Sequence, residues 1–336
     1  MLGFCSSTRF TEHHTGAIHP ERPDRIRAIW TALSAAGYLA SPNPYPTFTL
    51  DFGPLPQARH KLVELSFSPA DPKWLATVHS TRHIKRIEHM SLMGGGILDS
   101  GDTVAGPDSY EIAVLAVGAT LRACDAVMTE EVTRCFVAER PPGHHAEPDR
   151  PMGFCLFNNV AIAAKYLQRT YGVERIAIVD FDVHHGNGTQ MCFEDDPSVY
   201  YASLHQHPQT LYPGTGYDWE IGVGPGQGFT LNMPFNPGAG DEEYLSAVHT
   251  RIVPALEQYR PQVMLLSAGF DAHRDDPMAQ IDLSEDAFET MTRALASVME
   301  HDGKGRIISV LEGGYNLRAL GRSVVRHLMG LGLYHA

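Results

Sequence analysis

Short apolar runs alternate with longer segments of helical periodicity over most of this chain. Runs of apolar and β-branched residues predict buried strands at residues 133–137, 175–181, 198–204, 229–233, 262–267 and 306–311. Helices are expected at residues 23–36, 71–90, 108–128, 158–171, 241–259 and 284–300, and from about residue 317 onward. Gly37 and Gly172 follow two of these helices, where a glycine commonly ends a helix. Apolar strands that alternate with helices are typical of a parallel sheet covered on both faces.

The same alternation continues without a break in composition. The 336 residues contain no linker rich in Pro, Gly or Ser, no low-complexity tract and no internal repeat. We therefore expect a single domain over residues 1–336. The predicted fold class is α/β, with an open, mostly parallel β-sheet, helices on both faces and the active site at the carboxyl ends of the strands.

Polar residues directly follow four of the predicted strands. They occupy residues 140–146, 179–189, 268–273 and 312–316. Because the carboxyl ends of parallel strands line one crevice, we expect these four segments to converge on one site. The alternative is a set of ordinary loops with turn aspartates and a core histidine, which suits one such segment better than four.

The second of these segments offers ligands for a metal ion. Extended geometry sends alternate side chains to one face, so Asp180, Asp182 and His184 share a side. Asp271, at another strand end, completes an Asp/His/Asp set that leaves a fourth position for water. That pattern is typical of a catalytic rather than a structural zinc site, although iron(II) and cobalt(II) suit the same ligands.

Three further residues suit the cleavage of an amide. The adjacent His144 and His145 supply imidazoles, which titrate near neutral pH and serve as general bases. Tyr315 follows Gly313 and Gly314, which let the backbone approach closely. Its hydroxyl is expected to donate a hydrogen bond to the developing oxyanion.

Composition narrows the partners and the compartment. The chain has 26 basic and 39 acidic residues, and its net charge of −13 disfavours a nucleic-acid partner and mildly favours cationic substrates. Its five cysteines form no Cys-x-x-Cys pair, which indicates neither a disulfide framework nor a thiolate zinc site. We find no secretory signal and no apolar run near the roughly 18 residues that span a bilayer, so we expect a cytoplasmic protein without a membrane partner.

The motifs together resemble those of zinc-dependent deacetylases of the histone deacetylase and acetylpolyamine amidohydrolase superfamily, and the class II branch with its bacterial relatives in particular. The matching segments keep the family's order and spacing, at residues 140–148, 153–159, 179–190, 193–199, 267–271 and 311–316. The resemblance runs from about His19 to the C-terminus and implies the arginase/deacetylase fold.

The resemblance assigns a role to each candidate in the site. It makes Asp182, His184 and Asp271 the ligands of one catalytic zinc ion. It makes His145 the general base, which deprotonates the metal-activated water and then protonates the leaving amine. It gives His144 an electrostatic role.

The resemblance also pairs each of these histidines with a partner. His144 would pair with Asp180, and His145 would pair with Asn187. Class I members carry an aspartate at the position of Asn187. An amide orients an imidazole but does not stabilise its positive charge as a carboxylate does. Tyr315 would polarise the acyl carbonyl, and its presence predicts a competent enzyme.

Potassium binding is implied by the resemblance alone. Backbone oxygens would hold a first potassium ion at Asp180, Asp182, His184, Ser203 and Leu204. A second potassium ion would lie near Phe193 and Val199.

Five residues are expected to bind the substrate. Phe154 fits the first aromatic wall of the family's tunnel, whereas Tyr212 stands where phenylalanine is usual. Met278 occupies the rim position at which polyamine-selective relatives place a glutamate and lysine deacetylases a leucine. Gly153 and Gly313 complete the set. Because Met278 carries no charge, we expect acyl-lysine in peptides or proteins as the substrate rather than acetylpolyamines.

Two other functions stay open at this point. One is a deacetylase of acetylpolyamines or other small acylated amines, and the other is a metal-binding module without turnover, against which His145 and Tyr315 argue. His273 and Asp275 resemble the ligand spacing of binuclear manganese ureohydrolases, but we expect them to pack in a loop. His185 is expected to pack behind the site.

Overall fold

A computed structural model describes residues 1–101, 103–301 and 304–332 of the chain. Its main sheet has the strand order β2-β1-β5-β10-β9-β6-β7-β8, and all neighbouring strands in it are parallel. These strands are β1 (Leu2–Ser6), β2 (Val63–Glu64), β5 (Arg134–Ala138), β6 (Ile176–Asp180), β7 (Val199–Gln206), β8 (Thr230–Phe235), β9 (Val263–Ala268) and β10 (Ile307–Leu311). A separate antiparallel pair consists of β3 (Gly96–Ile97) and β4 (Val104–Ala105).

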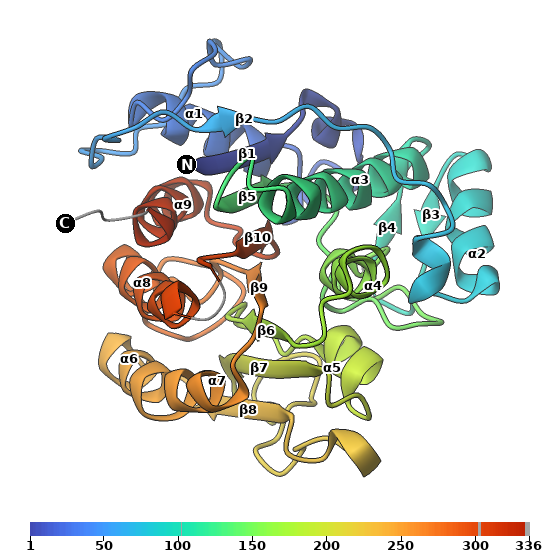
Figure 1. Ribbon diagram of the computed structural model, residues 1–336. Helices are drawn as coiled ribbons and strands as arrows, with labels where there is room; N and C mark the ends of the chain where they lie inside the picture. Colours follow the sequence, from blue (N-terminus) through green and yellow to red (C-terminus); the bar gives the residue numbers. More distant parts are fainter. Residues whose placement is uncertain (102, 302–303, 333–336) are drawn as a thin grey trace.

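Helices cover both faces of the sheet (Figure 1). On one face α1, α9 and α8 pack in succession, and on the other α3 packs against α4. The helices are α1 (Asp24–Ala35), α2 (Thr81–Leu92), α3 (Ser109–Met128), α4 (Asn159–Tyr171), α5 (Asn187–Phe193), α6 (Asp241–Ala247), α7 (Val253–Tyr259), α8 (Glu285–His301) and α9 (Leu317–Leu331). The predicted α/β class with a parallel sheet is confirmed.

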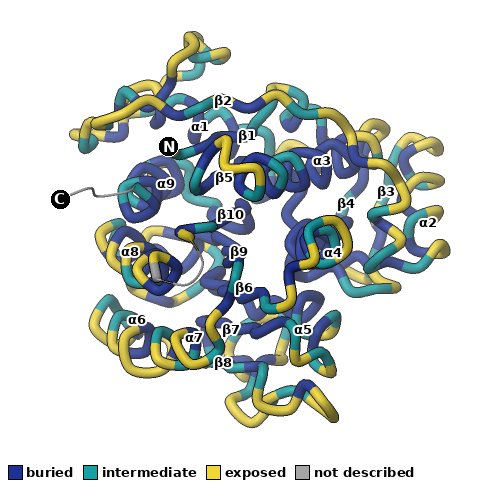
Figure 2. The backbone as a smooth tube through the Cα atoms, in the orientation of Figure 1, coloured by how far each residue is buried: buried dark blue, intermediate teal, exposed yellow. Residues whose placement is uncertain are grey.

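The central strands are buried along their whole length, because helices lie on both sides of them. Every residue of β5, β6, β7, β9 and β10 is buried. Figure 2 shows the same arrangement, with buried residues along the central strands and most exposed residues on the outer helices and loops. The apolar runs therefore predicted these strands correctly, since a strand covered on two faces needs apolar residues at every position.

Three parts of the predicted order differ from the structure. The helix expected at residues 71–90 is wrong in its first half: a 3₁₀ turn at Leu75–Thr77 is followed by a break, and α2 begins after Ser80. Ser80 sets that start because its hydroxyl accepts a hydrogen bond from the backbone N–H of His83, at 3.2 Å. The strands β1, β2, β3 and β4 and the short helix α5 were not predicted.

No helix within the described ranges is long and apolar enough to cross a membrane.

The helical segment predicted at residues 241–259 is continuous, but it consists of α6, a π-helical stretch at Val248–Ile252 and α7.

A buried ion cluster ties the N-terminal segment to the sheet. Arg140, just after β5, donates to the Glu21 carboxylate at 2.8 Å and to the backbone oxygen of Phe10, also at 2.8 Å. Arg25 donates to Glu21 at 3.0 Å and to the backbone oxygen of Gly314 at 2.7 Å. Burial favours a neutral Glu21, but the two guanidinium charges outweigh it and lower the pKa of that carboxyl. All three charged side chains are buried, so the cluster depends on its internal pairing.

Replacing Arg140 tests that dependence. Arg140→Leu leaves the Glu21 carboxylate buried with a single guanidinium, and we expect the free energy of unfolding to fall by about 3–5 kcal/mol. Urea denaturation measures the change. The control is Arg9→Ala, which removes a half-exposed pair with Glu12 at 3.0 Å and should cost about 1 kcal/mol or less. Equal losses in the two variants would contradict the role of the cluster.

Candidate active site

The four polar segments meet at the carboxyl edge of adjacent strands, as expected from the sequence. The strands β5, β10, β9 and β6 are neighbours in that order. In the segment that follows β10, the backbone N–H of Gly313 donates to Asp182 at 2.7 Å, and the carboxylate of Glu312 accepts from the N–H of Gly143 at 2.7 Å. The N–H of Val183 donates to Asp271 at 2.9 Å. These bonds connect all four segments directly.

Asp182, His184 and Asp271 form a buried group of metal-ligand type. The Nδ1 atom of His184 lies 3.0 Å from Asp182 Oδ1 and 3.2 Å from Asp271 Oδ2. One ligand atom from each of the three residues lies within 4.8 Å of the others. Bonds of about 2.0–2.2 Å in a tetrahedral zinc site place ligand atoms roughly 3.3–3.6 Å apart, so the three side chains fit a zinc ion with little adjustment.

The electrostatics of this group also favour a cation. Burial and the nearby charge of Asp182 raise the pKa of Asp271 to about 7. Burial favours a neutral His184, but its hydrogen bonds to both carboxylates outweigh that effect and raise its pKa to about 10. Two buried carboxylates at this spacing need positive charge between them. A divalent cation bound by all three residues supplies it.

Two glycines predicted to bind substrate lie against the polar side chains of the site. A Cβ atom on Gly313 would stand 2.1 Å from Asp271 Oδ2 and 2.5 Å from Asp182 Oδ2. A Cβ atom on Gly153, whose φ is +56°, would stand 2.2 Å from Cδ2 of His145. Both positions therefore require glycine, because any side chain would displace a residue of the site.

The two adjacent histidines differ in their surroundings. His144 Nδ1 lies 3.0 Å from Asp180 Oδ2, and His145 Nδ1 lies 2.8 Å from Asn187 Oδ1. Burial favours a neutral His144. The charges of Asp180, Asp182 and Glu312 outweigh that effect and raise the pKa of His144 well above the ordinary value.

Burial acts on His145 without such compensation. It lowers the pKa of His145 well below the ordinary value, and the neighbouring charges of His144 and His184 lower it further. The pair therefore combines a charged and a neutral imidazole, and the neutral ring is the one able to accept a proton.

Tyr315 is held at the edge of the metal-ligand group. Its backbone N–H donates to Asp276 Oδ2 at 2.6 Å, and the guanidinium of Arg25 lies 5.1 Å from the centre of its ring. Burial and the charge of Asp271 raise the pKa of the Tyr315 hydroxyl well above its ordinary value. The hydroxyl therefore stays protonated and available as a donor.

Two aromatic rings flank these groups. Phe154 packs edge to face against Tyr315, with 5.8 Å between ring centres. Tyr212 packs edge to face against His145, with 5.2 Å between ring centres, and is 46% exposed. Met278 is half-buried on the loop of Asp276, to which its N–H donates at 3.0 Å. The structure thus brings the predicted wall residues next to the predicted base and oxyanion donor.

His185 points away from the metal-ligand group and anchors a loop. Its Nδ1 lies 2.9 Å from the hydroxyl of Thr215, and its Nε2 lies 2.9 Å from Oε1 of Gln190. Burial lowers its pKa well below the ordinary value, so the ring is neutral. The loop bound by His185 also carries Tyr212. His185 therefore helps to position Tyr212, which the sequence did not indicate.

The residues predicted around potassium lie in two separate places. Ser203 pairs in register with Asp180 at the carboxyl end of β6, and Leu204 follows it. Phe193 ends α5, and Val199 pairs with Ile176 at the opposite end of β6. Potassium binding at either place stays a prediction.

Three carboxylates near the site were not singled out from the sequence. Glu312, Asp276 and Glu147 each accept hydrogen bonds from backbone or side-chain groups of the site. Glu312 lies with His144 and Cys155 in a second group of metal-ligand type, but its oxygens already accept from two backbone N–H groups and from the hydroxyl of Ser267. A carboxylate that directly follows a buried strand was the available signal for Glu312.

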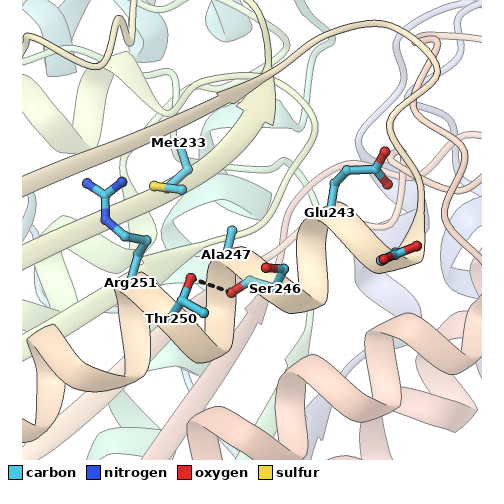
Figure 3. Close-up of a pocket in the computed structure, with 7 residues that line it drawn as sticks. Met233, Glu243, Ser246, Ala247, Thr250 and Arg251 are labelled. Atoms are coloured by element: carbon cyan, nitrogen blue, oxygen red, sulfur yellow. Dashed lines mark hydrogen bonds between the residues drawn. The ribbon is translucent and has the colours of Figure 1, made fainter.

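A separate hollow on the surface lies beside β8 and α6 (Figure 3). It is lined by Met233, Glu242, Glu243, Ser246, Ala247, Thr250 and Arg251. Its polar groups serve the helix itself, since Glu243 accepts from the N–H of Gly240 at 3.0 Å and Thr250 donates to the backbone oxygen of Ser246 at 2.7 Å. None of the predicted site residues lines this hollow.

Comparison with known proteins gives one consistent family. Residues 19–331 match the histone deacetylase domain. The chain is 40% identical over 316 residues to a histone deacetylase-like amidohydrolase of Pseudomonas aeruginosa, in an alignment that covers 93% of this chain and 77% of that protein. It is 36% identical over 317 residues to a probable deacetylase of Archaeoglobus fulgidus, with 94% of this chain and 82% of that protein covered. The solved HD domain of HDA15 superposes with a TM-score of 0.87 at 34% identity, over 98% of this chain and 89% of that one.

Metal binding provides a test of the ligand group. Adding Zn²⁺ to chelator-treated protein should raise the melting temperature, and Asp182→Ala and Asp271→Ala should each abolish most of that rise because two ligands bind zinc far more weakly than three. Elemental analysis of zinc per chain provides the second readout. The control is Asp275→Ala, whose side chain is 68% exposed and close in sequence to Asp271. Loss of zinc in the control variant alone would contradict this assignment of the ligands.

Proposed function

The chain belongs to the histone deacetylase family and is a hydrolytic deacetylase, and we propose that it uses zinc to remove acetyl or other short acyl groups from the ε-amine of lysine in peptides or proteins. The observation that carries the proposal is geometric. The ring of His145 packs edge to face against that of His184, with 5.9 Å between ring centres, and Tyr315 lies on the loop of Gly313, whose N–H donates to Asp182 at 2.7 Å. A base, an oxyanion donor and a set of metal ligands are the parts that amide hydrolysis requires.

The side chains divide the reaction among themselves. Asp182, His184 and Asp271 would hold the zinc ion, which would supply a Lewis acid for the acyl carbonyl and for the attacking water. His145 accepts the proton of the attacking water and delivers it to the amine nitrogen as the carbon–nitrogen bond breaks. His144, charged and paired with Asp180, adds positive potential near the oxygen that gains charge. Tyr315 donates its hydroxyl hydrogen to that oxygen, and the products are a carboxylate and an ammonium group, which together keep both protons of the water.

The tunnel residues support a slender aliphatic arm as the substrate group. Phe154 and Tyr212 present rings beside Tyr315 and His145, respectively. Met278, near the rim, carries no charge that would bind a distal ammonium group. A cytoplasmic location, binding of potassium and a single domain stay predictions from the sequence.

Replacing Tyr315 tests the oxyanion donor. Tyr315→Phe should lower kcat on a fluorogenic acetyl-lysine reporter by at least about 10²-fold, the scale of one lost donor, while the zinc content stays unchanged. The matched control is Tyr171→Phe on α4, which removes a hydroxyl that donates to Asp125 at 2.7 Å. A zinc-loaded wild type that turns over no acyl amide would instead favour a binding module.

Substrate choice is tested at the rim. The wild type should have a higher kcat/KM on an acetyl-lysine peptide than on N-acetylputrescine or N-acetylspermidine. Met278→Glu should shift the ratio toward the polyamines, because a carboxylate at the rim attracts a distal ammonium group. A wild type that prefers the polyamines would contradict acyl-lysine as the substrate and support a small-molecule deacetylase.

A further inference from the structure

The amide of Asn187 lies between the predicted base and a carboxylate. Its Oδ1 lies 2.8 Å from His145 Nδ1, and its Nδ2 donates to Glu147 Oε1 at 2.7 Å and to Met152 Sδ at 3.3 Å. Glu147 in turn accepts two hydrogen bonds from Arg150, at 3.1 and 3.0 Å. A connected series of hydrogen bonds therefore runs from an exposed arginine to the buried His145.

The carboxylate at the middle of this series sets the direction of every bond between it and His145. An ionised carboxylate only accepts, so the NH₂ group of Asn187 must face Glu147 and its carbonyl oxygen must face His145. A carbonyl oxygen only accepts as well, and His145 must then carry its hydrogen on Nδ1. The lone pair of the neutral ring is left on Nε2, which is the form a general base needs.

We propose that Glu147 is a positioning residue that fixes the tautomer of His145 through Asn187. The proposal rests on the proposed function, since it concerns the same base. Glu147 touches neither the metal ligands nor the reacting atoms, and it acts only by orienting the amide. Without the carboxylate, only the weak acceptor Met152 Sδ still favours this orientation of the Asn187 amide. The other orientation presents NH₂ to His145 and favours the wrong tautomer.

The same geometry explains why position 187 holds an amide in this chain. An aspartate there would place a carboxylate oxygen about where Nδ2 now lies, 2.7 Å from Glu147 Oε1. Two like charges at that distance repel each other strongly, particularly since the side chain of Glu147 is only 13% exposed. Asn187 and Glu147 are thus a matched pair, and a carboxylate at position 187 requires a donor at position 147.

The turn that carries Glu147 does not depend on its carboxylate. The backbone N–H of Glu147 donates to the oxygen of Arg150 at 3.0 Å, and the backbone oxygen of Glu147 lies 3.0 Å from Nδ1 of His79. The next residue, Pro148, accepts from the N–H of Ser80 at 2.9 Å. A change of the Glu147 side chain therefore leaves the turn in place.

The test compares Glu147→Gln in two backgrounds, with kcat, KM and the tautomer of His145 as readouts. In the wild type, Glu147→Gln should lower kcat on the acetyl-lysine reporter by about 10-fold with KM within about 2-fold. This is the lower end of the roughly 10- to 100-fold lost when a group that orients a metal ligand is removed. In the Asn187→Asp background, the same change should raise kcat, because the new amide donates to one oxygen of the introduced carboxylate while His145 donates to the other. The matched control is Asp149→Asn, the same chemical change on the same turn, with an effect within about 2-fold.

The second readout does not require turnover. In zinc-loaded protein labelled with ¹⁵N-histidine, the His145 signals should indicate Nδ1–H in the wild type and a mixture of tautomers in Glu147→Gln. Glu147→Ala, which removes both oxygens, should give the same mixture. An unchanged tautomer, or an equal loss of kcat in both backgrounds, would overturn the proposal. A wild type with the expected tautomer and no activity on acyl-lysine would reject the proposed function and leave this inference standing.

Discussion

The structure depends on the close approach of two buried carboxylates, Asp182 and Asp271, at the edge of a parallel sheet. Backbone N–H groups of Gly313 and His184 donate to the two oxygens of Asp182, and that of Val183 donates to one oxygen of Asp271. Nδ1 of His184 lies within 3.2 Å of an oxygen of each carboxylate. Leaving such charges unpaired in a buried place costs several kcal/mol. The need for a cation therefore precedes any argument about catalysis. The same burial and the charge of Asp271 also raise the pKa of Tyr315 and keep its hydroxyl protonated.

A second set of buried charges holds the surroundings of this centre. Glu21 pairs with Arg140 after β5 and with Arg25 on α1, and Arg25 also donates to the backbone oxygens of Glu312 and Gly314. The loop after β10 is thus fixed by Arg25 and also by Asp276, which accepts the N–H of Tyr315. The ion cluster thus contacts, through Arg25, the loop that carries Tyr315, the proposed oxyanion donor.

The sequence predicted the parts of the site that follow from strand ends, and it missed those that follow from side-chain direction. Apolar runs located β5, β6, β9 and β10, and parallel pairing brought their carboxyl ends together, so the group of Asp182, His184 and Asp271 was predictable. The strands β1 and β2 were not. Val63–Glu64 has only two residues, and Leu2–Ser6 has Gly3 inside its apolar run and ends in a serine. The helix predicted at residues 71–90 ran through Ser80, where α2 actually begins. The spacing of apolar residues does not show that a serine caps the start of a new helix.

Position 187 shows the same limit within the site. The sequence showed an amide where related enzymes of class I have a carboxylate, and this indicated a weaker partner for His145. It did not show that Glu147, 40 positions earlier, accepts a hydrogen bond from that amide, because the direction of a side chain on a turn depends on contacts distant in sequence. The structure gives the amide another interpretation. The carboxylate of Glu147 lies one residue further from His145 and, in our proposal, acts through the orientation of Asn187.

Neighbouring histidines take opposite tasks because their partners differ. His184 faces two carboxylates and suits a cation, whereas His185 faces a hydroxyl and an amide and stays neutral. His185 also holds the loop that carries Tyr212, whose ring lies against His145. The predicted wall residue Tyr212 and the proposed base His145 are thus both positioned by the segment after β6, through His185 and Asn187, respectively. A change in the loop that moves Tyr212 will therefore also change the packing against His145, the proposed base.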